Sequence, residues 1–163
     1  MRRTPSIMQD RTLVRAPEPG DRDAWVPMYL EYAVAVESTH TGQAEADVLW
    51  KWLLEGTHRV GAFFAFVDER LAGFAVYRPF PRTLDGNEAC YLDDLFVDSA
   101  FRGFGIAERL VDAVKNESVR RGWTEVRWVT LPDNARARKL YDRIAVDADL
   151  VTYRVIVRAA GGK

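Results

Sequence analysis

The chain has 163 residues, with 23 Lys and Arg against 24 Asp and Glu, for a formal net charge of −1. This balance argues against a nucleic-acid partner, which selects for a basic surface. No apolar run approaches the roughly 18 residues of a membrane-spanning helix, so we expect no membrane partner. The one cysteine, Cys90, excludes an internal disulfide and is typical of a reducing compartment, so we predict a cytoplasmic protein in which Cys90 is a small buried apolar residue.

Length predicts one domain over residues 1–163, with loose tails at 1–11 and 159–163. Hydrophobic spacing then gives the elements of the first half. They are a strand at Thr12–Arg15, a helix from Asp21 to Val36, a helix at Ala44–Leu54, a hairpin of Val60–Val67 with Leu71–Tyr77, and a turn-rich loop at Arg78–Asn87. The second helix is expected to turn Val48, Leu49, Trp52 and Leu53 inward and Trp50 to the other side.

The second half begins with a strand at Cys90–Val97 and ends with another strand. Between them we expect a helix at Ile106–Arg121 capped by Gly122, a strand at Glu125–Thr130 and a helix at Asn134–Arg143, before the last strand at Val151–Arg158. This order predicts an α/β (α+β) fold with helices on both faces of the sheet. It also predicts a parallel crossover between the fourth and fifth strands.

Between the Cys90–Val97 strand and the following helix lies a glycine-bearing loop, R-G-F-G-I-A, at residues 102–107. Glycines allow the main chain to approach phosphate oxygens, and a helix N-terminus carries partial positive charge. No Lys follows the second glycine, which excludes a P-loop, and Glu108 stands where a dinucleotide fingerprint needs its third glycine. The alternative is a helix N-terminus after a tight turn, with no ligand.

The hexad resembles the coenzyme A loop of the GNAT N-acetyltransferases, R/Q-x-x-G-x-G/A, at Arg102, Gly105 and Ala107. A second segment resembles the family's N-x-x-A-x-x-L-Y pattern; it matches at Asn134, Ala137, Leu140 and Tyr141. The resemblance covers roughly residues 90–143 and looks closest to the spermidine/spermine (thialysine) and yeast-type histone/polyamine branches. It implies the GNAT fold, a mixed, mostly antiparallel sheet of about six to seven strands.

Three positions depart from the family pattern. Asp93 replaces a longer Glu, Ala107 replaces a Gly, and Ile144-Ala145 stands where many members have Gly-Phe. The first departure bears on the catalytic base, and the last bears on the wall of the acceptor site.

The resemblance implies acetyl-CoA as co-substrate, no metal, and direct transfer of the acetyl group to an amine. Main-chain groups of Leu95, Phe96 and Val97 are implied to bind pantetheine, beside a bulge that splays this strand from Val126–Thr130. The other residues implied to contact the coenzyme are Arg102, Gly103, Phe104, Gly105, Ile106, Ala107, Glu108, Asn134 and Ala137.

An amine acceptor arrives protonated, so a base is needed. By resemblance Asp93 is that base or an amine-binding carboxylate, Asp94 holds the acceptor's charge, and Tyr141 protonates the departing thiolate. Neighbours on a regular strand point to opposite faces, so only one of Asp93 and Asp94 is expected to face the reaction. The alternatives are that a carboxylate caps a loop or pairs with an arginine, and that Tyr141 packs on the sheet.

These residues favour an acetyltransferase acting on a small cationic amine such as a polyamine, a diamine or an amino-acid-like amine. A protein lysine or N-terminus remains an alternative acceptor, and a non-catalytic acyl-CoA-binding module is an alternative function. Many members of the family are homodimers, for which apolar residues of the last strand offer a contact.

Overall fold

A computed structural model describes residues 11–157 of the chain. Its elements are β1 (Thr12–Arg15), α2 (Arg22–Ala35), α3 (Gln43–Glu55), β2 (Gly61–Val67), β3 (Arg70–Arg82), β4 (Asn87–Val97), α4 (Ile106–Arg121), β5 (Val126–Arg127) and α5 (Ala135–Ile144), with short 3-10 turns at Pro19–Asp21 and Ser99–Phe101. The chain forms two compact units that divide between Val129 and Thr130. In the described part of the chain, no helix is both long and apolar enough to cross a bilayer.

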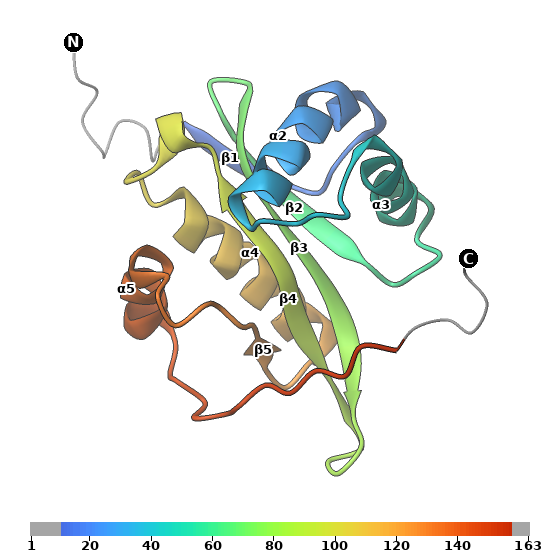
Figure 1. Cartoon of the computed structure of the whole chain (residues 1–163), viewed down its shortest axis with the longest axis vertical. Helices are drawn as coiled ribbons and strands as arrows, with labels where there is room; N and C mark the ends of the chain where they lie inside the picture. The colour runs from blue at the N-terminus through green and yellow to red at the C-terminus, as the bar shows by residue number, and fades with distance from the viewer. Residues whose placement is uncertain (1–10, 158–163) are drawn as a thin grey trace. The chain divides into compact units, whose positions relative to one another are not determined.

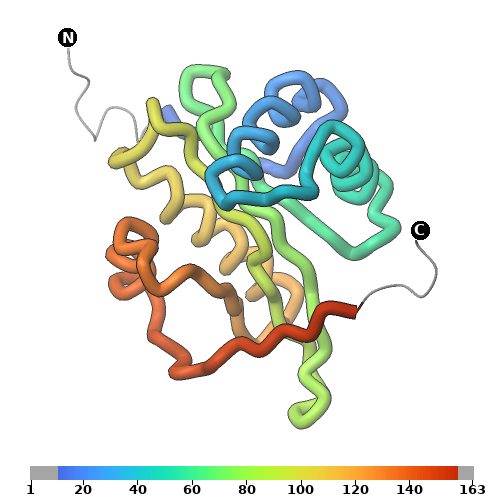
Figure 2. Tube along the Cα trace, viewed as in Figure 1, coloured from blue at the N-terminus to red at the C-terminus, as the bar shows by residue number. Residues whose placement is uncertain are grey.

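The first unit is built on one sheet with the strand order β1-β2-β3-β4-β5 (Figure 1). Neighbours are antiparallel as far as β4, and β5 runs parallel to β4. The predicted fold class and the parallel crossover are therefore confirmed. In the chain trace, the loop after β4 leads directly into α4, which runs back along the sheet (Figure 2).

The predicted six to seven strands are too many for the described residues, which form five. The strand expected at Glu125–Thr130 shortens to the two residues of β5, because β4 bulges where further pairing would begin. Residues 151–157 alternate like a strand in sequence but adopt no regular structure, and Arg158 lies outside the described residues. Of the predicted tails only Arg11 is described, and it forms an ion pair with Asp68.

Helices cover both faces of the sheet, as expected (Figure 1). On one face α2 and α3 close an aromatic core around Trp25, which is fully buried and stacks on Tyr29 and Phe64. On the other face α4 packs against the sheet, where Ser118 lies next to the buried Cys90. Cys90 is therefore the small buried residue that its position predicted.

The inward face of α3 differs from the prediction. Trp50 is buried against Trp25, whereas Val48 is 46% exposed. The main core-facing residues are Ala46, Leu49, Trp50 and Leu53, and Trp52 packs partly buried against the same core, so the inward positions of Leu49, Trp52 and Leu53 are confirmed. The main positions follow the i, i+3, i+4, i+7 spacing of one helix face. The buried face of α3 was predicted partly incorrectly, because apolar residues occur on more than one side of this helix.

The predicted loop at Arg78–Asn87 is instead the end of a long hairpin, in which β3 and β4 remain paired from Gly73–Val97 to Arg82–Asn87. Pro79 and Pro81 do not break the ladder. Their partners on β4 bond toward β5 instead. Cys90 N–H donates to the Glu125 carbonyl, and the Glu88 carbonyl accepts from Thr124 N–H. Each proline therefore sits at a non-hydrogen-bonded pair, where β3 needs no N–H toward β4.

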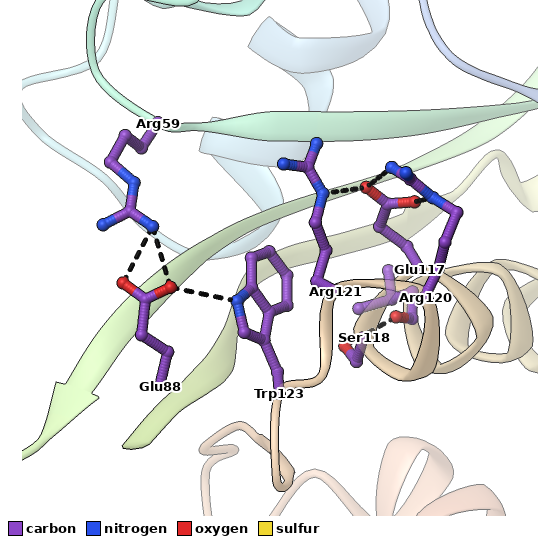
Figure 3. A network of polar contacts seen from close by, with 8 residues as sticks. Arg59, Glu88, Glu117, Ser118, Arg120, Arg121 and Trp123 are labelled. Atoms are coloured by element: carbon purple, nitrogen blue, oxygen red, sulfur yellow. Dashed lines mark hydrogen bonds and ion pairs between the residues drawn. The ribbon is translucent and has the colours of Figure 1, made fainter. Parts of the chain in front are cut away.

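Side chains around Glu88 fasten the connection from α4 to β5 (Figure 3). The Glu88 carboxylate accepts hydrogen bonds from Arg59 at 2.9 Å and from the Trp123 indole at 3.3 Å. One turn back on α4, Glu117 accepts from Arg120 and Arg121. These contacts set where β5 enters the sheet beside β4.

Candidate active site

A β-bulge in the middle of β4 shapes the candidate site. Val76 pairs with Asp94 and Tyr77 with Leu92, so Asp93 has no partner on β3. An inserted residue bends the strand and interrupts the alternation of its side chains. The expectation that Asp93 and Asp94 point to opposite faces is wrong for this reason. Both carboxylates reach the face covered by α2 and α3, as their contacts show.

Asp94 is held in place by Tyr32 of α2. The Tyr32 hydroxyl donates a hydrogen bond of 2.8 Å to Asp94 Oδ1, and the Tyr32 ring packs edge-on against Phe74 and tilted against Phe96. Burial raises the pKa of the Asp94 carboxyl above its usual value, the Tyr32 hydrogen bond opposes this rise, and the charge of Asp93 adds to it. The effect of Asp93 on that pKa means that the two carboxylates act on one another.

Asp93 is held from β3. Its Oδ2 lies 3.0 Å from Nε of Arg78, which is two residues beyond Val76 and therefore on the same face as Asp94. The Arg78 guanidinium also lies 5.1 Å from the centre of the Tyr91 ring. Burial raises the pKa of the Asp93 carboxyl, and the Arg78 charge and hydrogen bond lower it in part. The Asp93 and Asp94 carboxylates, the Arg78 guanidinium and the Tyr32 phenol thus lie in one patch.

Beyond the bulge, no strand within residues 11–157 pairs with β4 on the side of β5. Pairing between β4 and β5 involves only Cys90–Val126 and Tyr91–Arg127. Asp98 N–H bonds Ala72 on β3, so by alternation the main-chain groups of Leu95 and Val97 point away from β3. The Val97 carbonyl accepts a 2.8 Å hydrogen bond from Nε of Arg102. Leu95 therefore offers a main-chain donor and acceptor at an opening in the sheet.

The glycine loop takes the shape that its sequence predicts. Gly103 and Gly105 have φ of 83° and 78°, a region that favours glycine. Gly105 is the N-cap of α4, so the first N–H groups of that helix project from its start without helical partners. Space is open around the Cα of Gly103. Such a cradle of N–H groups at a helix N-terminus fits a diphosphate.

Within the loop, Arg102 is placed by β4. Besides its bond to Val97, its guanidinium lies 5.7 Å from the centre of the Phe96 ring. Phe104 lies between the two glycines, Ile106 is buried, and Ala107 and Glu108 lie in the first turn of α4. The contacts of these residues with a coenzyme remain predictions.

The second unit contains the other predicted residues. Asn134 is the N-cap of α5: its Oδ1 accepts from the N–H of Ala137 at 3.2 Å, and its Nδ2 donates to Thr130 at 3.3 Å. Tyr141 follows two turns later on the same helix. Burial raises the pKa of its phenol, which keeps the hydroxyl protonated at neutral pH. The predicted roles of these residues toward a coenzyme stay predictions.

Sequence reasoning missed Tyr32 and Arg78. Tyr32 was one of several apolar-spaced residues on its helix, and nothing local distinguishes it. Arg78 fell in the segment read as a loop, so it had no predicted face. Cys90 offers no nucleophile, because burial raises its pKa to about 11. Residues 11–157 contain no cluster of three His, Cys, Asp or Glu that could hold a metal ion.

Comparison with known proteins gives a consistent result. The model of the acetyltransferase (GNAT) family matches residues 23–145. The chain is 29% identical over 150 residues to the D-amino-acid N-acetyltransferase HPA3 of Saccharomyces cerevisiae, an alignment that covers 91% of this chain and 92% of that one.

Solved structures agree. The ribosomal-protein-alanine N-acetyltransferase from Brucella melitensis biovar Abortus superposes with a TM-score of 0.72 at 26% identity, covering 90% of this chain and 99% of that one. The aminoglycoside enzyme AAC(6')-Iy, in complex with the bisubstrate analog CoA-S-monomethyl-acetylneamine, superposes with a TM-score of 0.76 at 19% identity, covering 90% and 99%. At that identity the second likeness concerns the fold alone.

Proposed function

The chain belongs to the GNAT family of acetyltransferases, and from this premise we propose that it acetylates the primary amine of a small cationic acceptor at the carboxylate pair on the β4 bulge. GNAT acetyltransferases use acetyl-CoA. The observation that supports the acceptor site is the convergence of Asp93 and Asp94 on one face, beside the opening between β4 and β5. Two interacting carboxylates attract a cationic amine and can hold it there.

Acetyl-CoA supplies the activated acetyl group, and the residues present fit it. The main chain of Leu95 and the N–H groups of Gly103–Glu108 would bind pantetheine and diphosphate, with Arg102 nearby and Asn134 and Ala137 at the start of α5. These main-chain donors need no side-chain movement, so binding can fix the reacting atoms in place. We also propose that residues 1–163 form one acetyltransferase domain, of which residues 23–145 match the family model.

The residues then divide the proton transfers. Asp93 accepts one proton from the acceptor ammonium, directly or through water, and passes it to solvent. The freed nitrogen forms the amide bond while the carbon–sulfur bond breaks, and Tyr141 gives a proton to the departing sulfur. Tyr141 recovers its proton from the nitrogen, so the balance is one ammonium and one thioester giving one amide, one thiol and one proton.

The raised pKa of Asp93 suits this role. A base works best when its pKa is close to the working pH, and the desolvation that raises the pKa of Asp93 makes its carboxylate a stronger base. Asp94, tied to Tyr32, is fixed in position and supplies negative charge to the ammonium.

The test is thiol release from acetyl-CoA with a panel of polyamines, diamines, amino acids, aminoglycosides and a basic peptide. We expect saturable release with a small amine. Release with the basic peptide alone would favour a protein lysine or N-terminus, the acceptor type suggested by the name of the Brucella enzyme. Binding of acetyl-CoA without release for any amine would contradict the proposal and favour a binding module.

The finer predictions of a polyamine acceptor and of a homodimer belong to this proposal. The panel tests the prediction of a polyamine acceptor, because it compares spermidine and spermine with amino acids. Light scattering of the purified chain tests the prediction of a homodimer.

A further inference from the structure

Arg78 is an unexpected cation in a site built for a cation. An acceptor such as a polyamine needs negative charge alone, and an arginine beside Asp93 cancels part of it. Arg78 is 45% exposed, so its ion pair with Asp93 is accessible to an entering ligand. Something other than a simple polyamine is therefore favoured by the charges of this patch.

The geometry of Arg78 leaves its binding fork free. Its hydrogen bond and its ion pair to Asp93 both use Nε. Within residues 11–157 the two terminal nitrogens make no hydrogen bond, and the Tyr91 ring supports the guanidinium from one side. Paired terminal N–H groups of arginine match the two oxygens of a carboxylate.

Resting on the function proposed above, we propose that the acceptor is an α-amino acid whose carboxylate binds Arg78 and whose α-ammonium binds Asp93 and Asp94. In an α-amino acid the two charged groups are attached to one carbon. Arg78 and Asp93 are themselves in contact, so a ligand with adjacent opposite charges can meet both. Asp94, bonded to Tyr32 instead of to a cation, keeps its charge for the ammonium.

This arrangement also links recognition to proton transfer. In the free protein the Arg78 charge and hydrogen bond hold down the pKa of Asp93. An acceptor carboxylate bound to the terminal nitrogens of Arg78 neutralises part of the Arg78 charge, so that charge lowers the pKa of Asp93 less and Asp93 becomes a stronger base once the correct ligand is present. An amine without a carboxylate leaves Asp93 paired with Arg78. Arg78 is thus a specificity-determining residue.

The experiment compares amino acids with the amines obtained by removing their carboxylate. The pairs are phenylalanine with 2-phenylethylamine, ornithine with putrescine, and lysine with cadaverine, using both enantiomers of each amino acid. For the natural sequence we expect the better member of at least one pair to be the amino acid, by about 10- to 100-fold in kcat/KM, the range of a charge-assisted hydrogen-bond pair.

Arg78→Met should remove that preference: KM for the amino acid should rise, whereas KM for the decarboxylated amine should fall, since a repelling charge is gone. Arg78→Lys should restore part of the preference, because lysine keeps the charge without the fork. Arg11→Met is the matched control, because Arg11 also forms an ion pair at 3.0 Å, with Asp68. This substitution should change kcat/KM for neither substrate.

Three outcomes would overturn the inference. Decarboxylated amines that are used as well as the amino acids in every pair would do so while leaving the proposed acetyltransferase function intact. Equal losses for both members of a pair in Arg78→Met would also do so, since they would assign Arg78 a structural role. Failure of every amine to release thiol, with acetyl-CoA bound, would remove the proposed function and this inference together.

Discussion

Replacing Tyr32 by Phe tests the carboxylate pair by removing one atom. The Tyr32 hydroxyl donates a hydrogen bond to the Asp94 carboxylate. The Tyr32 ring contributes to the core through Phe74 and Phe96, and Phe retains these contacts. The substitution therefore removes the hydrogen bond to Asp94 without opening a cavity, and a double-mutant cycle measures the part of its cost that depends on Asp94.

The expected cost is about 2 kcal/mol in the free energy of unfolding at pH 7, since a hydrogen bond to a charged group contributes about 1.5–3 kcal/mol. The cost depends on pH. The pKa of Asp94 is raised in the folded protein, so ionisation of Asp94 already opposes folding, and stability falls as pH rises through that pKa. Without the hydroxyl the pKa rises further. The two proteins should therefore differ at neutral pH and converge as Asp94 becomes protonated.

The assay is urea unfolding across pH, with Tyr29→Phe as the control. Tyr29 lies one turn earlier on α2 in the same aromatic cluster; burial and the charge of Asp94 raise the pKa of its phenol, with no contribution from a hydrogen bond to the described residues. Tyr29→Phe should cost less than about 0.5 kcal/mol. A double-mutant cycle with Asp94→Asn should give a coupling of about 1 kcal/mol or more. Additive effects, or a Tyr32→Phe cost that is the same at every pH, would refute the reasoning.

Four further substitutions test other parts of the account. Gly73→Ala should cost about 3 kcal/mol in urea unfolding, because its Cβ would lie 2.5 Å from the Phe96 carbonyl oxygen; a cost below about 1 kcal/mol would contradict this close packing. Asp21→Asn should cost about 2 kcal/mol at pH 7, because Arg15 lowers the pKa of Asp21; that stability is lost as pH falls below about 4, so an undiminished difference in acid would be inconsistent. Gly105→Asp should abolish acetyl-CoA binding in calorimetry, whereas Gly86→Asp, at a turn glycine with a similar positive φ, should not; equal binding by both would exclude the loop. Tyr141→Phe should lower turnover far more than acetyl-CoA affinity, and unchanged turnover would remove Tyr141 as the acid.

Local sequence carried enough information for the elements whose ends are set by a few residues. Gly105 and Gly122, both with positive φ, bound α4 where the sequence predicts. Asn134 caps α5 through its own side chain, a bond that depends on residues three apart. The fold class followed from the order of such elements.

The details that decide the site depend on pairing between distant residues. Nothing in Y-L-D-D-L-F marks Asp93 as the residue left over when β4 pairs with β3, so a regular alternation was the natural expectation. Pro79 and Pro81 suggested a loop, because proline is uncommon inside a sheet. Strand β3 accommodates both prolines only because their partners on β4 bond toward β5, which the local sequence does not show. The same mistake hid Arg78. The role of Tyr32 depends on the packing of α2 over the bulge of β4, which the sequence of α2 alone does not show.

The central claim is that an acceptor amine loses its proton at the carboxylates of the β4 bulge. The most direct test is the pH dependence of kcat/KM for the best acceptor in the panel, compared between the natural sequence and Asp93→Asn at saturating acetyl-CoA. The account predicts an acid limb set by the raised pKa of Asp93, coupled to Asp94, that shifts or flattens in Asp93→Asn together with a loss of rate of about 100-fold or more. An unaltered profile with an unaltered rate would place the base elsewhere and contradict the account.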